Sequence, residues 1–563
     1  MNPPPNSDAI EIITLGGCGG FGMNATLVIH ERRALLIDYG IGFPGADRPG
    51  VAALVVDPSP IMQRVEHLEA VVLTHAHDDH IGGVPHLPQA WRHAPFIGAP
   101  LTLAAVRDRC RDHSAACALR LEILDPGQRR ECGPFSIEML SVAHSVPQSR
   151  ALAIDTPAGL IVFTADFKLD PSPPDGIVSD EAGFRRLGKR GVRLLAIDST
   201  GARRPGTTPS ESEVRPRLLE QIGRATGQVV ASTFSSHLYR LEALIAAALE
   251  TGRRVAVAGR RMARMLHHAR SMDLIDIPAG LIETAEELLE RPPHRRLWLA
   301  GGSQAEPLSA LSRIARGQDP RIRLGEDDLV LISALVIPGN DAAISALVDR
   351  LLLTGARVVH SRDHPLLHVS GHASSEEIRT MMRWLRPKAV LPLHGEVSHL
   401  VAAGRLAREE GIAGEQIVIP GRGDVLRLDS ERFECVDHTE MHAGCLDDAG
   451  RPIAWERVLE RRRMAQAGTA WLTLLWLDEA EPGQDSLAGI EWRASGLAFD
   501  PGEEAILGMA REMVGSLTHT ASGVDTDTLR ARLATRVANR IRRGNLRRPL
   551  IIVDQRRLGD PTC

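Results

Sequence analysis

The chain has 563 residues, of which 43% are hydrophobic and 24% charged, and its formal net charge is −5. This composition is that of an ordinary globular protein, so it excludes a disordered or collagen-like chain, and the length suffices for about four domains. The slightly acidic balance also excludes an overall positive field for nucleic acid, so any polyanion must bind at a local site.

The sequence shows no sign of membrane insertion or export. An apolar run such as Trp471–Leu477 is far shorter than the roughly 18 residues that a membrane-spanning helix needs. The N-terminal MNPPPNSDAIE lacks the basic and apolar regions of a signal peptide, so we expect a cytoplasmic protein. The seven cysteines are irregularly spaced and form no CxxC pair, which argues against a disulfide framework and against a cysteine zinc site.

The first forty residues are typical of strands joined by turns. Apolar, β-branched segments predict strands at Glu11–Leu15, Asn24–Ile29 and Ala34–Asp38, and a glycine-rich turn at Gly16–Gly22 separates the first two. Three of these glycines match the G-x-G-x-x-G fingerprint of dinucleotide-binding proteins, which requires a helix to begin at the turn. The strand-like sequence TLVI follows instead, so we reject a dinucleotide site here.

The next segment carries the most informative motif of the chain. A buried-strand pattern, Leu68–Thr74, leads directly into the sequence HAHDDHIGG. Potential metal ligands thus crowd the carboxyl end of a strand, where side chains of α/β proteins converge on a site, and imidazole with carboxylate suits zinc or manganese. We expect the first two ligands to reach one ion and the next two, at the start of a helix, to reach a second: His75 and His77, then Asp79 and His80.

Each of three further candidate ligands follows an apolar strand pattern. They are His144 in SVAHSVP, Asp166 in VFTADF and His394 in LPLHGE. Taken singly, a polar residue at a strand end is usually a cap or a satisfied hydrogen-bonding group. Together with the histidine motif they favour a two-metal site, in which Asp166 would be a carboxylate shared by both ions.

The pattern of apolar residues changes twice along the rest of the chain. Within residues 213–363 short apolar runs alternate with helical patterns, which predicts βαβ units and a parallel sheet in a domain of its own. Residues 364–430 return to short strands, and the polar, poorly periodic stretch that follows is interpreted as a linker over 431–460. A strand at Ala470–Leu477 and an amphipathic helix with Leu529, Leu533, Val537 and Ile541 on one face predict a small C-terminal α/β domain.

Several motifs resemble those of one family. The series HxHxDH, His, Asp and His is the pattern of the metallo-β-lactamase fold. More specific are IDSTGARRPGTTPSE at 197–211, SALVIPGND at 333–341 and HVSGHASSEE at 368–377. These resemble ribonuclease J, the bacterial β-CASP branch, whose nucleases process and degrade RNA. The resemblance covers nearly the whole chain.

The resemblance implies an α/β architecture with an insertion. The fold would be a metallo-β-lactamase αββα sandwich, residues 1–212 and 364–430, interrupted by a β-CASP α/β domain, residues 213–363. The linker 431–460 would lead to a small C-terminal α/β domain, residues 461–563. The βαβ pattern, which periodicity alone indicates, agrees with this division.

The resemblance also implies roles for individual side chains. One ion would be held by His75, His77 and His144, and the other by Asp79, His80 and His394. Asp166 would bridge the ions, Asp38 would orient the ligands from behind, and His372 would face the scissile phosphate. Segments that line the RNA phosphates would include Ser333, His368, Ser370 and Gly371.

We therefore expect hydrolysis of RNA phosphodiester bonds by a water that two divalent ions activate. Zinc suits the ligands best, with manganese or magnesium as alternatives. Asp79 or Asp166 could accept the proton of the water. His372 could stabilise the pentavalent oxyanion or protonate the leaving 3′-oxygen, because histidine titrates near neutral pH. The alternative for His372 is a structural histidine bonded within its own loop.

Four positions depart from the usual family pattern: Gly201, His237, Ala305 and Leu335, where asparagine, asparagine, glycine and serine are usual. They belong to segments near the RNA and its 5′ end and lie outside the metal set. They weaken the case for 5′-monophosphate sensing and 5′-to-3′ exonuclease action, and they leave the case for hydrolysis, including endonuclease action, intact.

Single-stranded RNA is the expected substrate, and a homodimer or homotetramer is the expected assembly. Aromatic residues are only 3% of the chain, so few can stack on bases; candidates are Phe43, Phe234, Tyr239 and Trp384. A small-molecule metallo-hydrolase of the thioesterase or lactonase type is the main alternative, but it has no evident need for residues 213–363. A weakly active RNA-binding paralogue is opposed by the intact ligand set.

Overall fold

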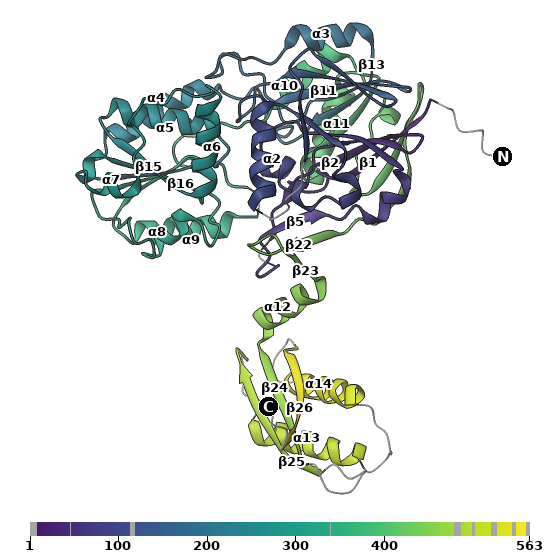
Figure 1. Ribbon diagram of the computed structural model, residues 1–563, viewed down its shortest axis with the longest axis vertical. Helices are drawn as coiled ribbons and strands as arrows, with labels where there is room; N and C mark the ends of the chain where they lie inside the picture. Colours follow the sequence, from purple (N-terminus) through teal and green to yellow (C-terminus); the bar gives the residue numbers. More distant parts are fainter. Residues whose placement is uncertain are drawn as a thin grey trace, which may run out of the picture. The chain divides into compact units, whose positions relative to one another are not determined.

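The computed structural model describes residues 8–45, 47–112, 119–337, 339–477, 486–497, 502–518, 526–542 and 548–558. The chain divides into a larger unit, residues 1–43 with 54–443, and a smaller unit, residues 44–53 with 444–563 (Figure 1). Within the described ranges no helix is both long and apolar enough to cross a lipid bilayer.

The larger unit is built around two facing sheets. The first has the strand order β21-β20-β1-β2-β3-β6-β7-β8. Its strands are β1 (Ile10–Gly16), β2 (Ala25–His30), β3 (Arg33–Ile37), β6 (His67–Val72), β7 (Pro95–Gly98), β8 (Arg120–Ile123), β20 (Asp424–Leu428) and β21 (Phe433–His438). The predicted strands in the first forty residues are confirmed, and β2 follows the glycine-rich turn where a dinucleotide site would need a helix.

The second sheet has the order β19-β13-β12-β11-β10-β9. Its strands are β9 (Arg129–Cys132), β10 (Phe135–Ser141), β11 (Arg150–Thr156), β12 (Gly159–Phe163), β13 (Val192–Asp198) and β19 (Ala389–Leu393). Apolar side chains from both sheets form one core between them, among them Val28 and Leu35 from the first and Ile137 and Leu391 from the second. Burial of such side chains is the main favourable contribution to folding.

Helices cover the outer faces of this sandwich. Phe184, Ile378 and Leu406 pack from three helices against the second sheet: α3 (Glu181–Arg190), α10 (Ser375–Leu385) and α11 (Val397–Glu409). On the first sheet α2 (Pro100–Asp112) contacts β7. The short α1 (Asp78–Ile81) contacts β4 (Ile41–Gly42), which pairs with β5 (Ala53–Val56) in a separate sheet. The expected αββα sandwich is thereby confirmed.

The inserted segment forms a parallel sheet of its own, in the order β15-β16-β14-β17-β18 (Figure 1). The strands are β14 (Val229–Ser232), β15 (Arg254–Ala258), β16 (Arg296–Ala300), β17 (Leu329–Ile332) and β18 (Arg357–His360). The helices are α4 (Val214–Gly223), α5 (Leu238–Glu250), α6 (Arg260–Ser271), α7 (Ala285–Leu289), α8 (Ala310–Ala315) and α9 (Asp341–Leu352). The predicted alternation of strands and helices is therefore confirmed.

A buried ion pair fixes the start of this insertion. The Arg240 guanidinium, on α5, donates from Nε and Nη2 to both carboxylate oxygens of Glu211, at 2.9 and 3.0 Å. Both side chains are almost fully buried. Arg240 also donates to the Ser333 hydroxyl and to the Leu367 carbonyl oxygen, so the pair joins segments on both sides of the inserted sheet.

Replacing Glu211 by alanine is expected to lower the free energy of unfolding by about 3–5 kcal/mol, because Arg240 would stay buried without its counter-charge. Urea unfolding followed by circular dichroism measures this. The matched control is Glu250→Ala, at the end of α5, which breaks an exposed pair with Arg215 on α4 and should cost at most about 1 kcal/mol. Equal losses in the two variants would contradict the role of the buried pair.

The stretch predicted as a linker contains regular structure. It carries all of β21, then β22 (Ala443–Leu446), β23 (Pro452–Ile453) and the start of α12 (Trp455–Ala467). β21 pairs with β20 at the edge of the first sheet, and all of its side chains except Phe433 are exposed. An edge strand with so little buried surface has no apolar pattern to recognise, which explains the difference.

The smaller unit includes the predicted C-terminal α/β fold. Its sheet has the order β25-β24-β26, formed by β24 (Thr469–Leu477), β25 (Ser486–Ser495) and β26 (Leu550–Leu558). Two helices pack on it, α13 (Glu503–Thr518) and α14 (Thr526–Arg542). The predicted apolar face of α14 is confirmed, since Leu529, Leu533, Val537 and Ile541 are all buried in the core of this unit.

Candidate metal centre

Strand directions bring the candidate ligands to one edge of the sandwich. In the first sheet β1, β3 and β6 run the same way, because β2 is antiparallel to its two neighbours and β3 is parallel to β6. In the second sheet β10, β12, β13 and β19 share one direction. Residues at or just beyond the ends of these strands gather at the site: Asp38, His75, His144, Asp166, Asp198 and His394.

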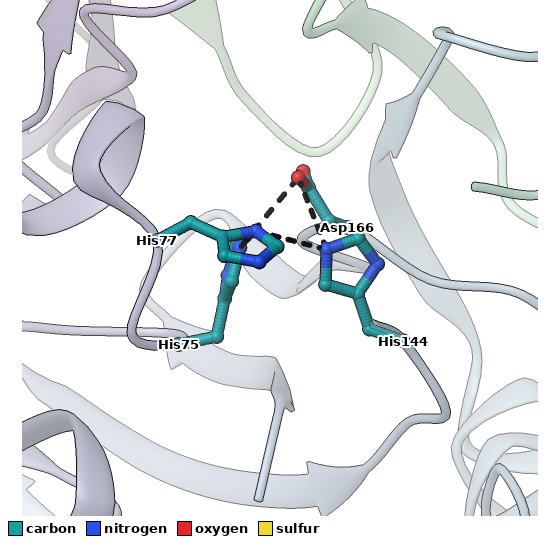
Figure 2. A group of neighbouring side chains, drawn as sticks. All are labelled: His75, His77, His144 and Asp166. Carbon is teal, nitrogen blue, oxygen red and sulfur yellow. Dashed lines mark hydrogen bonds and ion pairs between the residues drawn. The ribbon is translucent and has the colours of Figure 1, made fainter. Parts of the chain in front are cut away.

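One ligand group consists of His75, His77, His144 and Asp166 (Figure 2). His75 Nε2 and His144 Nε2 each lie 3.1 Å from His77 Nδ1, and the same two atoms lie 3.6 and 3.8 Å from Asp166 Oδ2. Figure 2 shows the imidazoles and the carboxylate converging on one point. This is the set that the sequence predicted for the first ion.

A second ligand group consists of Asp79, His80, Asp166 and His394. His394 Nε2 lies 3.3 Å from Asp79 Oδ2, and His80 Nε2 lies 3.3 Å from Asp166 Oδ2. Within each group the ligand atoms all lie within 4.8 Å of one another. Because Asp166 belongs to both groups, its carboxylate is placed as the predicted bridge would require.

Hydrogen bonds behind the ligands fix the orientation of their rings. His80 Nδ1 donates to Asp38 Oδ2 at 2.7 Å, and the Thr74 hydroxyl donates to the same oxygen at 2.8 Å. His75 Nδ1 lies 3.0 Å from that hydroxyl, and His144 Nδ1 donates to the Gly371 carbonyl oxygen at 2.7 Å. Each ring is therefore held through Nδ1, which leaves Nε2 to face the centre.

Replacing Asp38 by alanine is expected to weaken metal binding about 10–100-fold. His80 loses its hydrogen-bond acceptor, and the Thr74 hydroxyl that contacts His75 loses its own acceptor. Competition with a chelator of known affinity measures this. The control is Asp57→Ala, which removes an exposed carboxylate whose hydrogen bonds are local, to Ser59. Unchanged metal affinity in the Asp38 variant would contradict this orienting role.

Electrostatics divide the ligand histidines into two kinds. Burial lowers the pKa of His75 well below its ordinary value and that of His77 to about 4, so these rings are neutral. Burial also disfavours the protonated forms of His80 and His394. Nearby carboxylates, chiefly Asp166, outweigh this effect and raise the pKa of His80 well above its ordinary value and that of His394 to about 10. A divalent ion would replace the protons that balance these carboxylates.

The donor set fits divalent metal ions. Carboxylates of Asp38, Asp166 and Asp198 are at most 4% exposed, and such buried charges require cations or paired hydrogen bonds. Asp38, Ala165 and His394 also adopt left-handed backbone conformations, with φ between 50° and 56°, which are uncommon for non-glycine residues. Imidazole nitrogens combined with carboxylate oxygens are ligands that zinc accepts readily.

His372 lies at the open side of the two ligand groups. Its Nδ1 donates to Asp198 Oδ2 at 2.8 Å, and its ring centre is 5.1 Å from that of His144 and 5.3 Å from that of His394. Among the described residues, His372 and Asp198 form a third potential ligand group with Asp166 and His394. Asp198 was not among the predicted site residues, although it ends β13 in the motif IDST.

The residues predicted to line RNA phosphates occupy different environments. Ser333 is fully buried, and its hydroxyl donates to Leu367 O; His368 Nδ1 contacts the Arg240 guanidinium at 3.1 Å. Ser370 accepts from Arg204 at 2.9 Å and from the His372 backbone N–H at 3.1 Å. These contacts tie the segment around 368–372 to Arg240 of the inserted domain and to Arg204.

Gly371 is required by a close approach to a ligand. A Cβ atom at this position would lie 2.8 Å from the His144 ring, closer than side-chain carbons approach. Its carbonyl oxygen is also the acceptor that holds His144. The absence of a side chain at Gly371 therefore serves a metal-ligand histidine directly. In the sequence, Gly371 stood out only by its position between Ser370 and His372. That position could not reveal the contact with His144.

Another site residue missed by sequence reasoning is Asn24, at the start of β2. Its amide nitrogen lies 3.0 Å from His80 Nε2 and donates to the Asp79 carbonyl oxygen at 3.1 Å. The pairing of this loop with the histidine motif, 55 positions further along the chain, depends on tertiary structure. No local pattern in the sequence could have indicated it.

Sequence models of known families match three stretches of the chain. Residues 33–197 match the beta-lactamase superfamily domain, and residues 226–351 match the beta-CASP domain of ribonuclease J. Residues 358–420 match the Zn-dependent metallo-hydrolase RNA specificity domain. With the ligand groups described above, these matches define a metal-dependent hydrolase of the β-CASP branch of the metallo-β-lactamase superfamily.

Individual relatives identify the family within this class. The ribonuclease J of Thermus thermophilus is 36% identical over 513 residues, covering 90% of this chain and 87% of the relative. That of Mycobacterium tuberculosis is 40% identical over 432 residues, 75% of each chain. The chain belongs to the ribonuclease J family and is a metal-dependent hydrolase that acts on RNA.

A solved structure supports the fold alone. The crystal structure of a protein of unknown function from Enterococcus faecalis superposes with a TM-score of 0.50 at 16% identity. The match covers 75% of this chain and all of that one. At so low an identity it carries no information about the substrate.

Proposed function

We propose that the chain hydrolyses phosphodiester bonds of single-stranded RNA with two divalent ions, zinc being the ion that the ligands suit best. The observation that carries this proposal is the sharing of Asp166 between two groups of ligand atoms, each within 4.8 Å. Two ions that share a carboxylate can activate a water and neutralise the phosphate oxygens when they are bound. Manganese or magnesium remains the alternative.

The side chains have distinct tasks in this proposal. His75, His77 and His144 hold the first ion, and Asp79, His80 and His394 hold the second. Asp79 or Asp166 accepts the proton of the attacking water, since both carboxylates face the centre. His372 stabilises the charge on the pentavalent phosphate or protonates the leaving 3′-oxygen, with Asp198 setting its orientation.

The loop 368–372 is proposed to position the RNA backbone next to the ions. Arg204 supports this loop by donating to the Ser370 hydroxyl and to the His372 carbonyl oxygen. His368, Ser370 and Gly371 would line the phosphates, whereas Ser333, being buried, would act by holding this segment through Leu367. Endonuclease action, 5′-to-3′ exonuclease action or both are compatible with this arrangement.

One experiment separates this proposal from its rival, a small-molecule hydrolase. The protein is incubated with 5′-monophosphorylated RNA, with 5′-triphosphorylated RNA and with a generic thioester, each with and without chelator. We expect turnover of RNA that the chelator stops and that added zinc or manganese restores. Turnover of the thioester but not of either RNA would overturn the proposal. A preference for the monophosphorylated RNA would indicate exonuclease action.

We also propose that the chain assembles as a homodimer or homotetramer in the cytoplasm. In the smaller unit, Trp471 and Leu477 point to the side of β24 opposite its helix-facing residues and are 38% and 45% exposed. Exposed apolar side chains on one face of a sheet favour association. Sedimentation analysis of the full chain tests this, and a monomer at micromolar concentration would contradict it.

A further inference from the structure

An aromatic side chain lies beside the metal centre without an evident structural task. Phe21 is half-buried in the glycine-rich turn after β1. The centre of its ring is 6.0 Å from that of the ligand His394, at an interplanar angle of 76°. It is also 5.3 Å from the ring of His399, at 65°. The ring therefore meets the edge of the second ligand group and keeps part of its surface exposed.

The turn that carries Phe21 is fixed to the centre on two sides. Gly20 N donates to Gly395 O at 3.0 Å, and His394 N donates to Gly17 O at 2.6 Å. On the other side Met23 N donates to Ile41 O at 2.9 Å. The position of the Phe21 ring is thus set by backbone pairing to the metal-ligand loop, which is the rigidity that a binding site requires.

The surface next to this ring is open and apolar. Apart from its chain neighbours, no described residue has an atom within 4 Å of a Cβ built on Gly20, and a Cβ on Gly19 would meet only Val397, at 4.0 Å. Val397, at the start of α11, is itself 59% exposed. The turn beside Phe21 therefore faces open space next to an exposed apolar side chain.

We propose that Phe21 stacks on the base of a nucleotide next to the scissile phosphate. This inference rests on the proposed function, since it needs an RNA phosphate at the two ions. A single sugar separates the base of that nucleotide from the phosphate, and the Phe21 ring lies next to the ring of the ligand His394. Aromatic stacking accepts any base, so it would aid binding without imposing a sequence.

Two of the aromatic residues considered from the sequence are already engaged elsewhere. Tyr239 is buried and donates its hydroxyl to Asp175, and Trp384 stacks on Phe184 with an interplanar angle of 17°. Neither ring is placed to receive a base at the metal centre. Phe21 instead lies beside the metal centre, although no sequence pattern singles it out within its turn.

The test uses short single-stranded RNAs that differ only in one abasic nucleotide, placed on either side of the cleaved bond. Phe21→Ala should raise KM for the intact RNA on the order of tenfold to a hundredfold, with kcat changed much less. On the RNA that lacks the stacked base, wild type and variant should have the same KM. An equal loss on intact and abasic RNA, or no loss on either, would overturn the inference.

Further variants separate stacking from packing. Phe21→Trp should keep the wild-type KM, whereas Phe21→Leu, which fills similar space without a π-face, should behave like alanine. Metal content and thermal unfolding verify that each variant is intact, and Leu353→Ala, an exposed apolar truncation in the inserted domain, should leave KM unchanged. A wild-type KM in Phe21→Leu would contradict stacking. Failure of the proposed function would appear differently, as wild-type protein that cleaves no RNA.

Discussion

Replacing His77 by alanine is expected to lower RNA hydrolysis at least about a thousandfold, because the first ion would lose its central imidazole. His77 Nδ1 lies 3.1 Å from the Nε2 atoms of both His75 and His144. The measurement is kcat on labelled RNA, together with the number of metal ions per chain.

The fold should survive this change. His77 precedes α1 without capping it through its side chain, so its removal costs no helix-capping hydrogen bond. Thermal unfolding should shift little, and His67→Ala, at the exposed start of the preceding strand β6, serves as the matched control. Wild-type activity in the His77 variant would refute the assignment of the first ion.

Replacing His372 by alanine is expected to lower kcat about 10²–10⁴-fold while metal content and RNA binding stay as in wild type. The reason is its position: the ring lies beside His144 and His394, but it belongs to neither main ligand group. Single-turnover cleavage and a binding assay at saturating metal separate these effects.

Asp198 provides the companion test. Asp198→Asn removes the charge that holds His372 Nδ1 but keeps the shape of the side chain, so it should cause a smaller loss of kcat than His372→Ala. If His372 served only its own loop, alanine there would lower stability and leave kcat of the folded protein unchanged. That result would contradict its proposed part in the reaction.

Much of the site could be predicted because metal ligands follow strands. His75, His77, Asp79 and His80 are adjacent in sequence, and the remaining ligands each stand at a recognisable strand end. The parallel course of these strands then brings them to one edge. The interruption of the sandwich by a parallel sheet was readable for the same reason, since strands and helices alternate there with a clear period.

Other parts of the site depend on tertiary contacts that no local pattern encodes. Asn24 reaches the histidine motif only because β2 begins beside it, and Asp198 meets His372 across 174 positions. Ser333 belongs to a phosphate-lining motif by resemblance, yet its hydroxyl is buried against Arg240. The edge strand β21 was missed because exposed strands carry no apolar pattern.

Metal stoichiometry measured alongside activity tests the two-ion centre most directly. Purified wild-type chain should contain two divalent ions, lose all cleavage of single-stranded RNA when both are removed, and regain it when two per chain are restored. The Asp166→Ala variant should retain neither ion at full occupancy, because that carboxylate serves both groups. Cleavage that persists in metal-free wild-type protein, or that needs only one ion per chain, would contradict the account.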